Sequence, residues 1–390
     1  EPGYDRARAV WNGMIDKRPA LVARCAGVAD VLACVELARE HDLLVSVRGA
    51  GHHVGGKGVC DDGLVIDLSQ MREVRVDPHS RRARVAPGAT LADFDHEAQA
   101  FALATPLGIN STTGVSGLTL GGGFGWLTRS RGLAADNLVA ADVVTAEGQL
   151  LHTSEGHEAD LLWGLRGGGG NLGVVTSFEF RLHSVGPQVL AGLVVHPFAQ
   201  APAVMRHWRD FMGTAPEELT CWVVARKAPP VPFLPESWHG REVLLLPMLY
   251  SGDVAAGEKA SRALRGYGKP IADVVAPMPY AAFQKAFDPL LQPGARNYWK
   301  SHNYRTFPDA AIDALLARVE TLPSPQCEIF LGNLGGAAGR VPASATAYPH
   351  RDATFVMNVH ARWEDPRDDG ACTAWARGVF DAMSPFATGG

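Results

Sequence analysis

The sequence lacks several features that would assign it to a common class of protein. Its 390 residues contain no block of basic residues, the arginines are scattered, and the formal net charge is -5 at pH 7. Nucleic-acid binding is therefore not indicated. No apolar run is long enough to cross a bilayer, and the first residues show no signal-peptide pattern. We expect a protein that acts on a small organic molecule, with neither nucleic acid nor a membrane as a partner.

Cysteine is sparse and follows no pattern. The 6 cysteines form no CxxC pair, and no Cys/His grouping has the spacing of a zinc site. Most of them lie in apolar surroundings, which is typical of a buried, reduced thiol. The sequence therefore predicts a protein without a metal site, in a reducing, cytoplasmic compartment.

Glycine, in contrast, is abundant: 43 residues, against an average of roughly 7%. Much of the excess lies in three clusters, within residues 48–56, 114–125 and 167–173. Glycine costs backbone entropy and buries no side chain, so such loops make sense where backbone N–H groups approach a ligand closely, as around a phosphate. We infer that the three clusters together hold one large phosphate-bearing cofactor.

Apolar periodicity predicts short strands and few helices up to residue 186, and longer helices between strands after it. The fold class expected is α+β rather than regular βαβ, with a cofactor-binding domain at 1–186 and a substrate domain at 187–390. The expected strands are 19–25, 43–47, 64–68, 73–76, 82–85, 138–145, 150–153, 174–182, 243–246, 328–331 and 354–359. The expected helices are 4–14, 28–40, 90–101, 160–165, 203–211, 257–265 and 309–320, the third with Thr90 as its N-cap.

The third glycine cluster satisfies GxGxxG over residues 168–173. A dinucleotide fingerprint needs a strand before this motif and a helix after it, whereas here a helix precedes it and a strand follows. The pattern argues against a nicotinamide-binding Rossmann unit. It leaves a glycine-rich loop that packs close to a ligand or to another backbone.

The second cluster carries a stronger signal. Hydroxyls and free backbone amides alternate from Ser111 to Gly125, which suits pyrophosphate oxygens. A glycine-rich turn without a ligand is the alternative for this segment. For His52, in the first cluster, the alternative is a loop histidine that makes a structural hydrogen bond.

Four motifs in order give the run 19–183 a specific resemblance to a known family. They are Arg-Gly-Ala-Gly-His at 48–52, the Ser-Thr-Thr-Gly segment through the Gly-Gly-Gly at 111–123, Asp-Asn-Leu at 136–138, and the glycine-rich run at 165–173. The run resembles the FAD-binding module of the vanillyl-alcohol oxidase and para-cresol methylhydroxylase (PCMH) superfamily. Within it, the most similar group is the bacterial branch of the berberine-bridge-enzyme-like oxidases. The second half is similar too, through residues 298–301, 335–336, 349–351 and Trp363.

The resemblance implies a PCMH-type FAD-binding domain, FAD as cofactor, and an 8α-histidyl bond from His52 to the flavin. Such a bond withdraws electrons from the isoalloxazine and makes it a better hydride acceptor. Asn110 stands where some relatives carry a second, cysteine link, so a single bond is expected, and Val175 is expected near the ribityl or adenine end. The residues assigned to the cofactor are Arg48, Gly49, Ala50, Gly51, His52, His53, Gly56, Thr112, Thr113, Gly114, Gly117, Leu118, Gly121, Gly122, Gly123, Gly125 and Val175.

Relatives continue past the position of Gly390 with a segment that returns to the FAD domain and often supplies a catalytic tyrosine. Because the sequence ends before that segment, the base is expected in the second domain. The candidates are Glu328, Tyr298, Lys300, Asn358 and His360. Glu328 alternates with apolar neighbours, and a carboxylate on an inward strand face is costly unless it is used or paired. The alternatives are an ion pair of Glu328 with Arg340 or Arg351, a surface ion pair for Lys300, and a core position for Tyr298.

Taken as a whole, the sequence predicts an FAD-dependent oxidoreductase. Amine or alcohol oxidation by a flavin needs hydride transfer and a base for the O–H or N–H proton. We expect an oxidase that removes hydride from a C–H next to oxygen or nitrogen and passes electrons to O2. A flavin dehydrogenase with another acceptor, a flavin-holding protein without catalysis, and a nicotinamide-using reductase on the same fold stay open.

Overall fold

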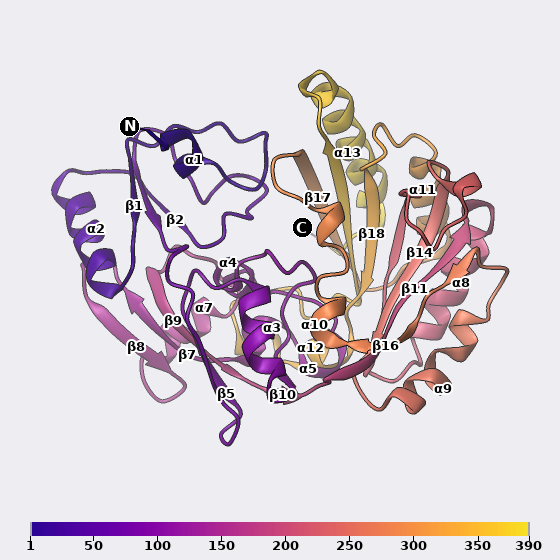
Figure 1. The fold of residues 1–390 in the computed structure, drawn as a ribbon, viewed down its shortest axis with the longest axis horizontal. Coiled ribbons are helices and arrows are strands. Elements are labelled where there is room, and N and C mark those ends of the chain that lie inside the picture. The colour runs from indigo at the N-terminus through magenta and orange to yellow at the C-terminus, as the bar shows by residue number, and fades with distance from the viewer. Residues whose placement is uncertain (1, 389–390) are drawn as a thin grey trace.

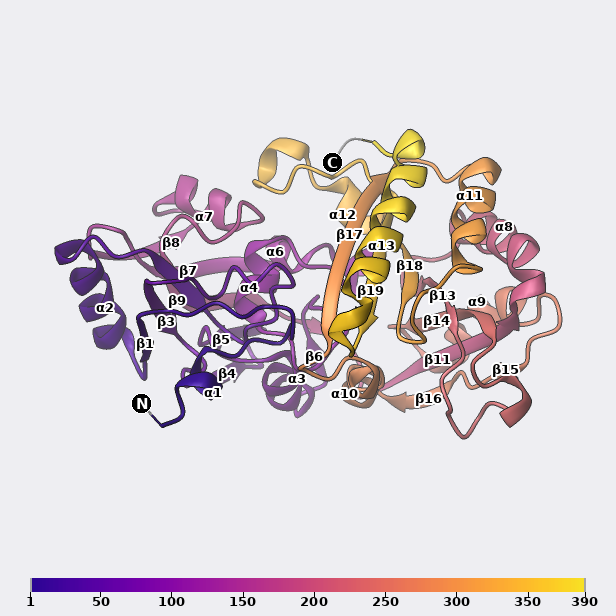
Figure 2. The ribbon, with the colours of Figure 1, turned by 90° about the horizontal axis from the view of Figure 1, so that it is seen from above.

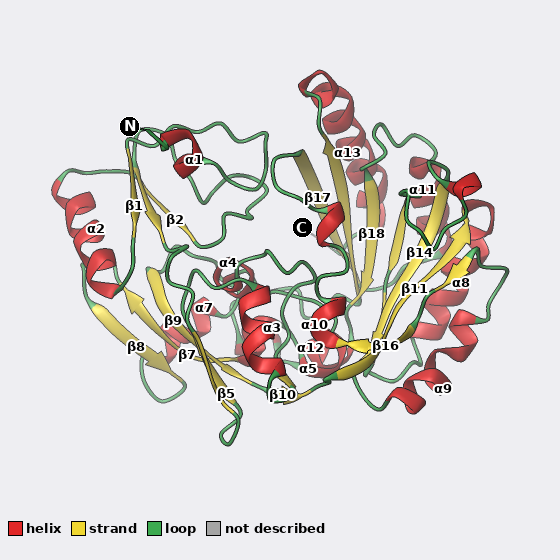
Figure 3. Cartoon of the chain, viewed as in Figure 1, coloured by secondary structure: helices red, strands yellow, loops and turns green. Residues whose placement is uncertain are grey.

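The computed structural model describes residues 2–388. The first half of the chain forms three small sheets, one of which is a two-stranded pair of β6 (Leu103–Ala104) and β10 (His183–Ser184), and the second half forms one large sheet. Figure 1 shows the small sheets on one side and the large sheet on the other. Figure 2 shows the same arrangement from above. The α+β class is confirmed, and Figure 3 shows helices and strands in both halves of the chain.

The first sheet contains three parallel strands in the order β1 (Leu21–Arg24), β3 (Leu64–Asp67) and β2 (Val45–Arg48). Helix α2 (Val28–Glu40) connects β1 to β2, so this part of the chain is one βαβ crossover, in the strand–helix–strand order that the sequence predicts. All residues of the central strand β3 are buried, as is usual in parallel sheets. The carboxyl ends of the three strands therefore meet at one edge, where the first glycine loop begins.

The second sheet is antiparallel and confirms both predicted hairpins. Its strands are, in spatial order, β4 (Val74–Asp77), β5 (Arg82–Val85), β9 (Val174–Arg181), β7 (Leu138–Val144) and β8 (Leu150–Ser154). Helix α3 (Leu91–Gln99) starts where predicted, because the Thr90 side chain accepts a hydrogen bond from the Asp93 backbone. Helix α7 (Ala159–Leu165) and β9 flank the third glycine cluster, which confirms that it is not a Rossmann turn. Helix α1 (Tyr4–Arg8) is shorter than predicted.

The second half of the chain builds a nine-stranded sheet around a helix-covered core. Its main path is β15 (Ala272–Asp273), β11 (Gln188–Pro197), β14 (Glu242–Tyr250), β13 (Val223–Lys227), β18 (Glu328–Asn333), β19 (Phe355–Trp363) and β17 (Arg296–Tyr304). Two short strands, β12 (Leu219–Cys221) and β16 (Ala276–Pro279), pair beside it. Helices α8 (Ala201–Met212), α9 (Val254–Arg265), α11 (Asp309–Val319) and α13 (Asp369–Met383) pack on one face (Figure 2). The predicted helices and strands of this half are confirmed, each with at least one end shifted, whereas β11, β13, β17 and α13 were not predicted.

The other face of this sheet packs against the first half of the chain. Trp222 stacks on Trp126 with ring centroids 4.2 Å apart, and Phe330 lies over Phe124 at 6.3 Å. These rings belong to one buried cluster with residues from both halves. The sheet therefore presents one face to its own helices and the other to the glycine loops. Among the described residues, none of the helices has the length and apolar character needed to cross a bilayer.

Tyr348 fills the space above the second and third glycine clusters. A Cβ at Gly122 would lie 2.6 Å from Tyr348 Cδ2, and a Cβ at Gly167 would lie 2.6 Å from Tyr348 Cβ. Both glycines have positive φ, +103° and +107°. Arg351 lies 5.2 Å from the centre of the Tyr348 ring and forms a bidentate ion pair with Asp136, at 2.8 and 2.6 Å. These contacts fasten the second half of the chain onto the first, and only glycine leaves room for them.

Replacing Gly122 tests this packing. We expect Gly122→Ala to destabilise the fold by about 2 kcal/mol or more, because it combines a strained backbone with a clash against Tyr348. Denaturant unfolding monitored by tryptophan fluorescence measures the change. Gly117→Ala is the matched control, since a Cβ there meets no heavy atom within 4 Å and its φ is not positive. Equal stability of the two variants would contradict the role given to Tyr348.

Candidate functional site

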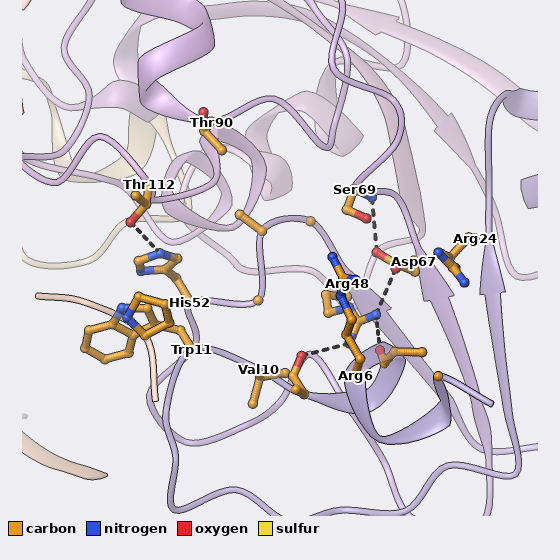
Figure 4. A pocket seen from close by; sticks show the side chains of 17 residues that line it. Arg6, Val10, Trp11, Arg24, Arg48, His52, Asp67, Ser69, Thr90 and Thr112 are labelled. Atoms are coloured by element: carbon orange, nitrogen blue, oxygen red, sulfur yellow. Dashed lines mark hydrogen bonds and ion pairs between the residues drawn. The ribbon is translucent and has the colours of Figure 1, made fainter. Parts of the chain in front are cut away.

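A cavity of about 730 Å³ opens at the carboxyl edge of the three parallel strands (Figure 4). Arg24, Arg48 and Asp67, which end β1, β2 and β3, line it together with the loop 49–52. Crevices at the carboxyl ends of parallel strands are common ligand sites. The volume lies within the range of roughly 300–1,000 Å³ that is usual for small-molecule and cofactor sites.

The Arg48 side chain lines this cavity and is bonded to the segments on both sides of it. Its Nη2 donates to Asp67 Oδ2 at 2.8 Å and to the Ala7 carbonyl at 2.6 Å, while Nη1 donates to the Ala9 carbonyl at 3.4 Å. Both partners of the ion pair are buried, with side-chain exposures of 8% and 4%. The guanidinium therefore holds the N-terminal segment across the cavity. Because the Arg48 side chain is used inside the protein, only the Arg48 backbone can make the contact with the cofactor that the sequence predicts.

The first and second loops touch with no room for side chains. A Cβ at Gly49 would lie 2.6 Å from Ser116 Oγ and 3.1 Å from the Pro87 carbonyl oxygen. A Cβ at Gly114 would lie 3.0 Å from the Cβ of Ala50. Glycine at these two positions lets the loops pack backbone to backbone, which leaves the 49–52 backbone on the cavity wall.

His52 ends the loop in a defined tautomer. Its Nε2 lies 2.9 Å from Thr112 Oγ1, and that hydroxyl donates its one hydrogen to Asn110 Oδ1 at 2.7 Å. The hydroxyl must then accept from Nε2–H, so Nδ1 keeps a free lone pair. Burial lowers the pKa of His52 to about 4, although the charge of Asp288 opposes this. The ring is therefore neutral at pH 7, and it stacks on Trp11 at 5.2 Å.

Four side chains form a straight row on the sheet face that looks toward His52. The register places Arg226 beside Glu328, Glu328 beside His360, and His360 beside Trp299, on strands β13, β18, β19 and β17. Arg226 Nη1 donates to Glu328 Oε2 at 2.7 Å, and His360 Nδ1 lies 2.9 Å from Glu328 Oε1. Trp299 stacks on His360 at 4.1 Å and meets Trp11 edge-on at 5.6 Å. A run of rings therefore links the wall to His52.

The environment of Glu328 corrects its predicted role as the base. Its partners are Arg226 and His360, whereas Arg340 pairs with Glu217 and Arg351 with Asp136. Burial alone would raise the pKa of Glu328, but the Arg226 charge and the His360 hydrogen bond lower the pKa to about 2. A carboxylate this acidic is a poor proton acceptor at neutral pH.

Tyr298 and Lys300 lie on the opposite face of the sheet, so their predicted catalytic roles are wrong. Arg377 of α13 donates to the Tyr298 hydroxyl at 3.2 Å, and Lys300 Nζ lies 4.7 Å from the centre of the Phe380 ring on the same helix. Side chains alternate along a strand, so Trp299, between them, faces the first half. Asn358 is on the correct face, beside Phe330, and its buried Oδ1 has no partner among the described residues.

The cofactor residues predicted from the sequence divide into two groups. Those on the cavity wall are Arg48, Gly49, Ala50, Gly51, His52 and Thr112. Those off it are His53, Gly56, Thr113, Gly114, Gly117, Leu118, Gly121, Gly122, Gly123, Gly125 and Val175. Val175 is buried in the core of the antiparallel sheet, and Gly122 lies against Tyr348.

Several wall residues were not predicted. They are Arg6, Trp11, Arg24, Asp67, Ser69, Thr90 and Pro293. Asp67 carried a signal, because it is a charged residue within an apolar strand. Trp11 carried none, because its partners lie far away in the sequence.

The side chains and backbone around the cavity fit FAD. Bare backbone at 49–51 and the Ser69 hydroxyl supply hydrogen-bond donors for a diphosphate. Arg6 and Arg24 add positive charge at the wall. Neutral His52 and Trp11 offer flat rings at the other end (Figure 4).

The Arg48–Asp67 pair generates a stability prediction. We expect Arg48→Met to destabilise the protein by about 3–5 kcal/mol, because it leaves the buried Asp67 carboxylate without its partner. Arg72→Met is the control, since Arg72 pairs with Asp93 at the surface and should cost less than about 1 kcal/mol. Denaturant unfolding curves of both variants provide the measurement. Similar midpoints would show that the buried pair does not secure this region.

Comparison with known proteins agrees with this description. A family model described as an FAD binding domain matches residues 19–154. An FAD-linked oxidoreductase of Dictyostelium discoideum is 28% identical over 383 residues, which cover 97% of this chain and 81% of that protein. The (R)-6-hydroxynicotine oxidase of Paenarthrobacter nicotinovorans is 38% identical over 194 residues, 50% of this chain and 42% of the relative.

Solved structures extend the likeness to the whole fold. The 6-hydroxy-D-nicotine oxidase of Arthrobacter nicotinovorans has a TM-score of 0.86 at 27% identity, covering 99% of this chain and 84% of that one. The xylooligosaccharide oxidase of Myceliophthora thermophila has a TM-score of 0.85 at 26% identity with the same coverage. A berberine-bridge-enzyme-like protein of Arabidopsis thaliana shares the fold with a TM-score of 0.88, at 24% identity over 100% of this chain and 84% of that one. This chain contains an FAD binding domain and shares the fold of these oxidases, which is consistent with the vanillyl-alcohol oxidase and PCMH superfamily that the sequence resembles.

Proposed function

We propose that this protein is an FAD-dependent oxidase that takes a hydride from a C–H next to oxygen or nitrogen in a small organic molecule. The broader statement, that it is an FAD-dependent oxidoreductase, follows from its FAD-binding domain and its oxidoreductase relatives. The observation that carries the proposal is the run of rings from His52 to the Glu328–His360 pair. These rings connect the loop that carries His52 to the sheet face that carries His360.

His52 carries the flavin through a covalent bond in this proposal. A neutral imidazole with a free Nδ1 lone pair is the form that can bond to the 8α carbon, and Thr112 holds that form in place. Asn110, at the position where a second link would start, is an amide that fixes Thr112 through two hydrogen bonds. A single bond, at His52, is therefore the linkage we propose.

The substrate would lie between the His52 end of the cavity and the sheet face of β17, β18 and β19. That face combines the Trp299 and Phe330 rings with the polar groups of Asn358 and His360. Aromatic faces hold flat or sugar rings, and a few polar groups fix their orientation. When bound, the flavin accepts the hydride, and O2 is the acceptor we propose for its electrons.

Replacing His52 tests the linkage. After acid precipitation, we expect a yellow pellet from the wild type and a colourless pellet from His52→Ala, with the matching loss of the FAD mass from the protein. His53→Ala is the matched control, because the His53 ring makes only a local bond with the Gly55 N–H. A yellow pellet from His52→Ala would move the linkage to another residue.

Reoxidation of the reduced flavin in air tests whether O2 is the electron acceptor. With xylobiose and (R)-6-hydroxynicotine as probes, we expect anaerobic bleaching of the flavin by a substrate-like molecule, and recovery of colour with release of hydrogen peroxide when air is admitted. Peroxide assay and absorbance follow both steps. Bleaching without recovery in air would instead favour a dehydrogenase that uses another acceptor.

A further inference from the structure

Arg226, Glu328, His360 and Trp299 form a row across four strands. Their contacts point to a proton acceptor other than Glu328, the carboxylate expected from the sequence. All four residues sit at paired register positions on adjacent strands, so the backbone ladder fixes their spacing. Arg226 is 9% exposed at its side chain, Glu328 14% and His360 12%. Burying three polar side chains away from water costs folding free energy unless they form hydrogen bonds with one another.

The other polar groups on this face cannot take a proton at neutral pH. Asn358 is an amide. Glu328 is committed to two donors, the guanidinium of Arg226 and the Nδ1–H of His360. Arg362, two residues along β19, donates to the Gln292 carbonyl at 2.5 Å and stays cationic.

His360 is oriented for the task by its neighbours. Because an ionised carboxylate only accepts hydrogen bonds, the 2.9 Å contact places the ring proton on Nδ1. Nε2 then carries a lone pair, and the one side-chain hydrogen bond found for His360 among the described residues is the one at Nδ1. Trp299 stacked on the ring at 4.1 Å prevents it from turning.

We propose that Nε2 of His360 is the catalytic base, and that Glu328 and Arg226 are positioning residues that hold its tautomer. This proposal rests on the proposed function, since a base is needed only if a hydride leaves the substrate. The substrate O–H or N–H would give its proton to Nε2, and the flavin, when bound, would supply the acceptor for the hydride of the neighbouring C–H. A C–O or C–N single bond thereby becomes a double bond. His360 becomes an imidazolium, whose new charge lies against the Glu328 carboxylate.

The charged groups around His360 are few. Arg226 lies on β13, Glu328 on β18 and Arg362 on β19 itself, while β17 contributes the uncharged Trp299. Glu328 is therefore the one anion that faces the ring from these strands. Its neutral replacement by glutamine keeps the shape of the row and removes the anion.

The nitrogen NMR spectrum of the holoprotein tests the tautomer directly. We expect the His360 signals, assigned by their loss in His360→Gln, to show a protonated Nδ1 and a bare Nε2 at neutral pH. In Glu328→Gln, the preference for Nδ1–H should weaken. A proton on Nε2 in the wild type would overturn the proposal, and this result requires no knowledge of the substrate.

Anaerobic flavin reduction tests the chemistry, with xylobiose and (R)-6-hydroxynicotine as probes. For a probe that bleaches the flavin, we expect His360→Gln to slow reduction by about 10²- to 10⁴-fold. Glu328→Gln should slow reduction while the probe concentration that gives half the maximal rate stays unchanged, which a merely structural defect would not do. His96→Gln, an exposed histidine of α3, is the control and should match the wild type.

The assignment of the base and the proposed function can fail separately. If His360→Gln retains FAD and reduces it within about threefold of the wild-type rate, the base is elsewhere and the oxidase proposal stands. If the wild type binds no FAD, the proposed function falls before the base is considered. If neither probe bleaches the flavin, the nitrogen spectrum alone decides the assignment.

Discussion

The contact of Trp11 with two other rings holds the site together. Trp11 stacks on His52, meets Trp299 edge-on and lies 5.3 Å from the Arg362 guanidinium. The Trp11 Nε1 donates to the Leu291 carbonyl, and the neighbouring Asn12 donates to the carbonyls of Val54 and Asn297. A short N-terminal segment thus ties the first glycine loop to strand β17. This contact adds to the packing of Tyr348 and the Arg351–Asp136 ion pair, which also join the two halves of the chain.

Glycine serves two purposes in this fold, and composition alone does not separate them. In the first loop, glycine lets backbone line a cavity, and Gly49 and Gly114 let two loops meet. In the later clusters, Gly122 and Gly167 make room for Tyr348 from the other half of the chain. Both uses require a close approach of backbone to another group. The difference lies in what approaches, and that is set by tertiary structure.

The parts of the fold that depend on local patterns could be predicted. Helix α2 spans 28–40 as expected, and Thr90 caps its helix, because both follow from neighbouring residues. The first loop and His52 could be placed because a strand and a motif adjoin each other. The face of β17 could not be predicted: Tyr298, Trp299 and Lys300 are all plausible inward residues, and a shift of one position exchanges the two faces. Likewise, nothing in the segment around Glu328 points to Arg226, which is 102 residues away.

A buried ion pair is weak evidence for stability, because removing two charges from water costs about as much as their attraction returns. Arg226 and Glu328 could in principle be replaced by apolar residues of similar size, as their neighbours Ala225 and Ile329 on the other face are apolar. Glu328 also accepts a hydrogen bond from His360, and that hydrogen bond fixes the proton on Nδ1 of the ring. A stabilising role alone would not require the third member. The cost of burying the charges is better explained if the row sets the protonation of a group that faces the cofactor loop.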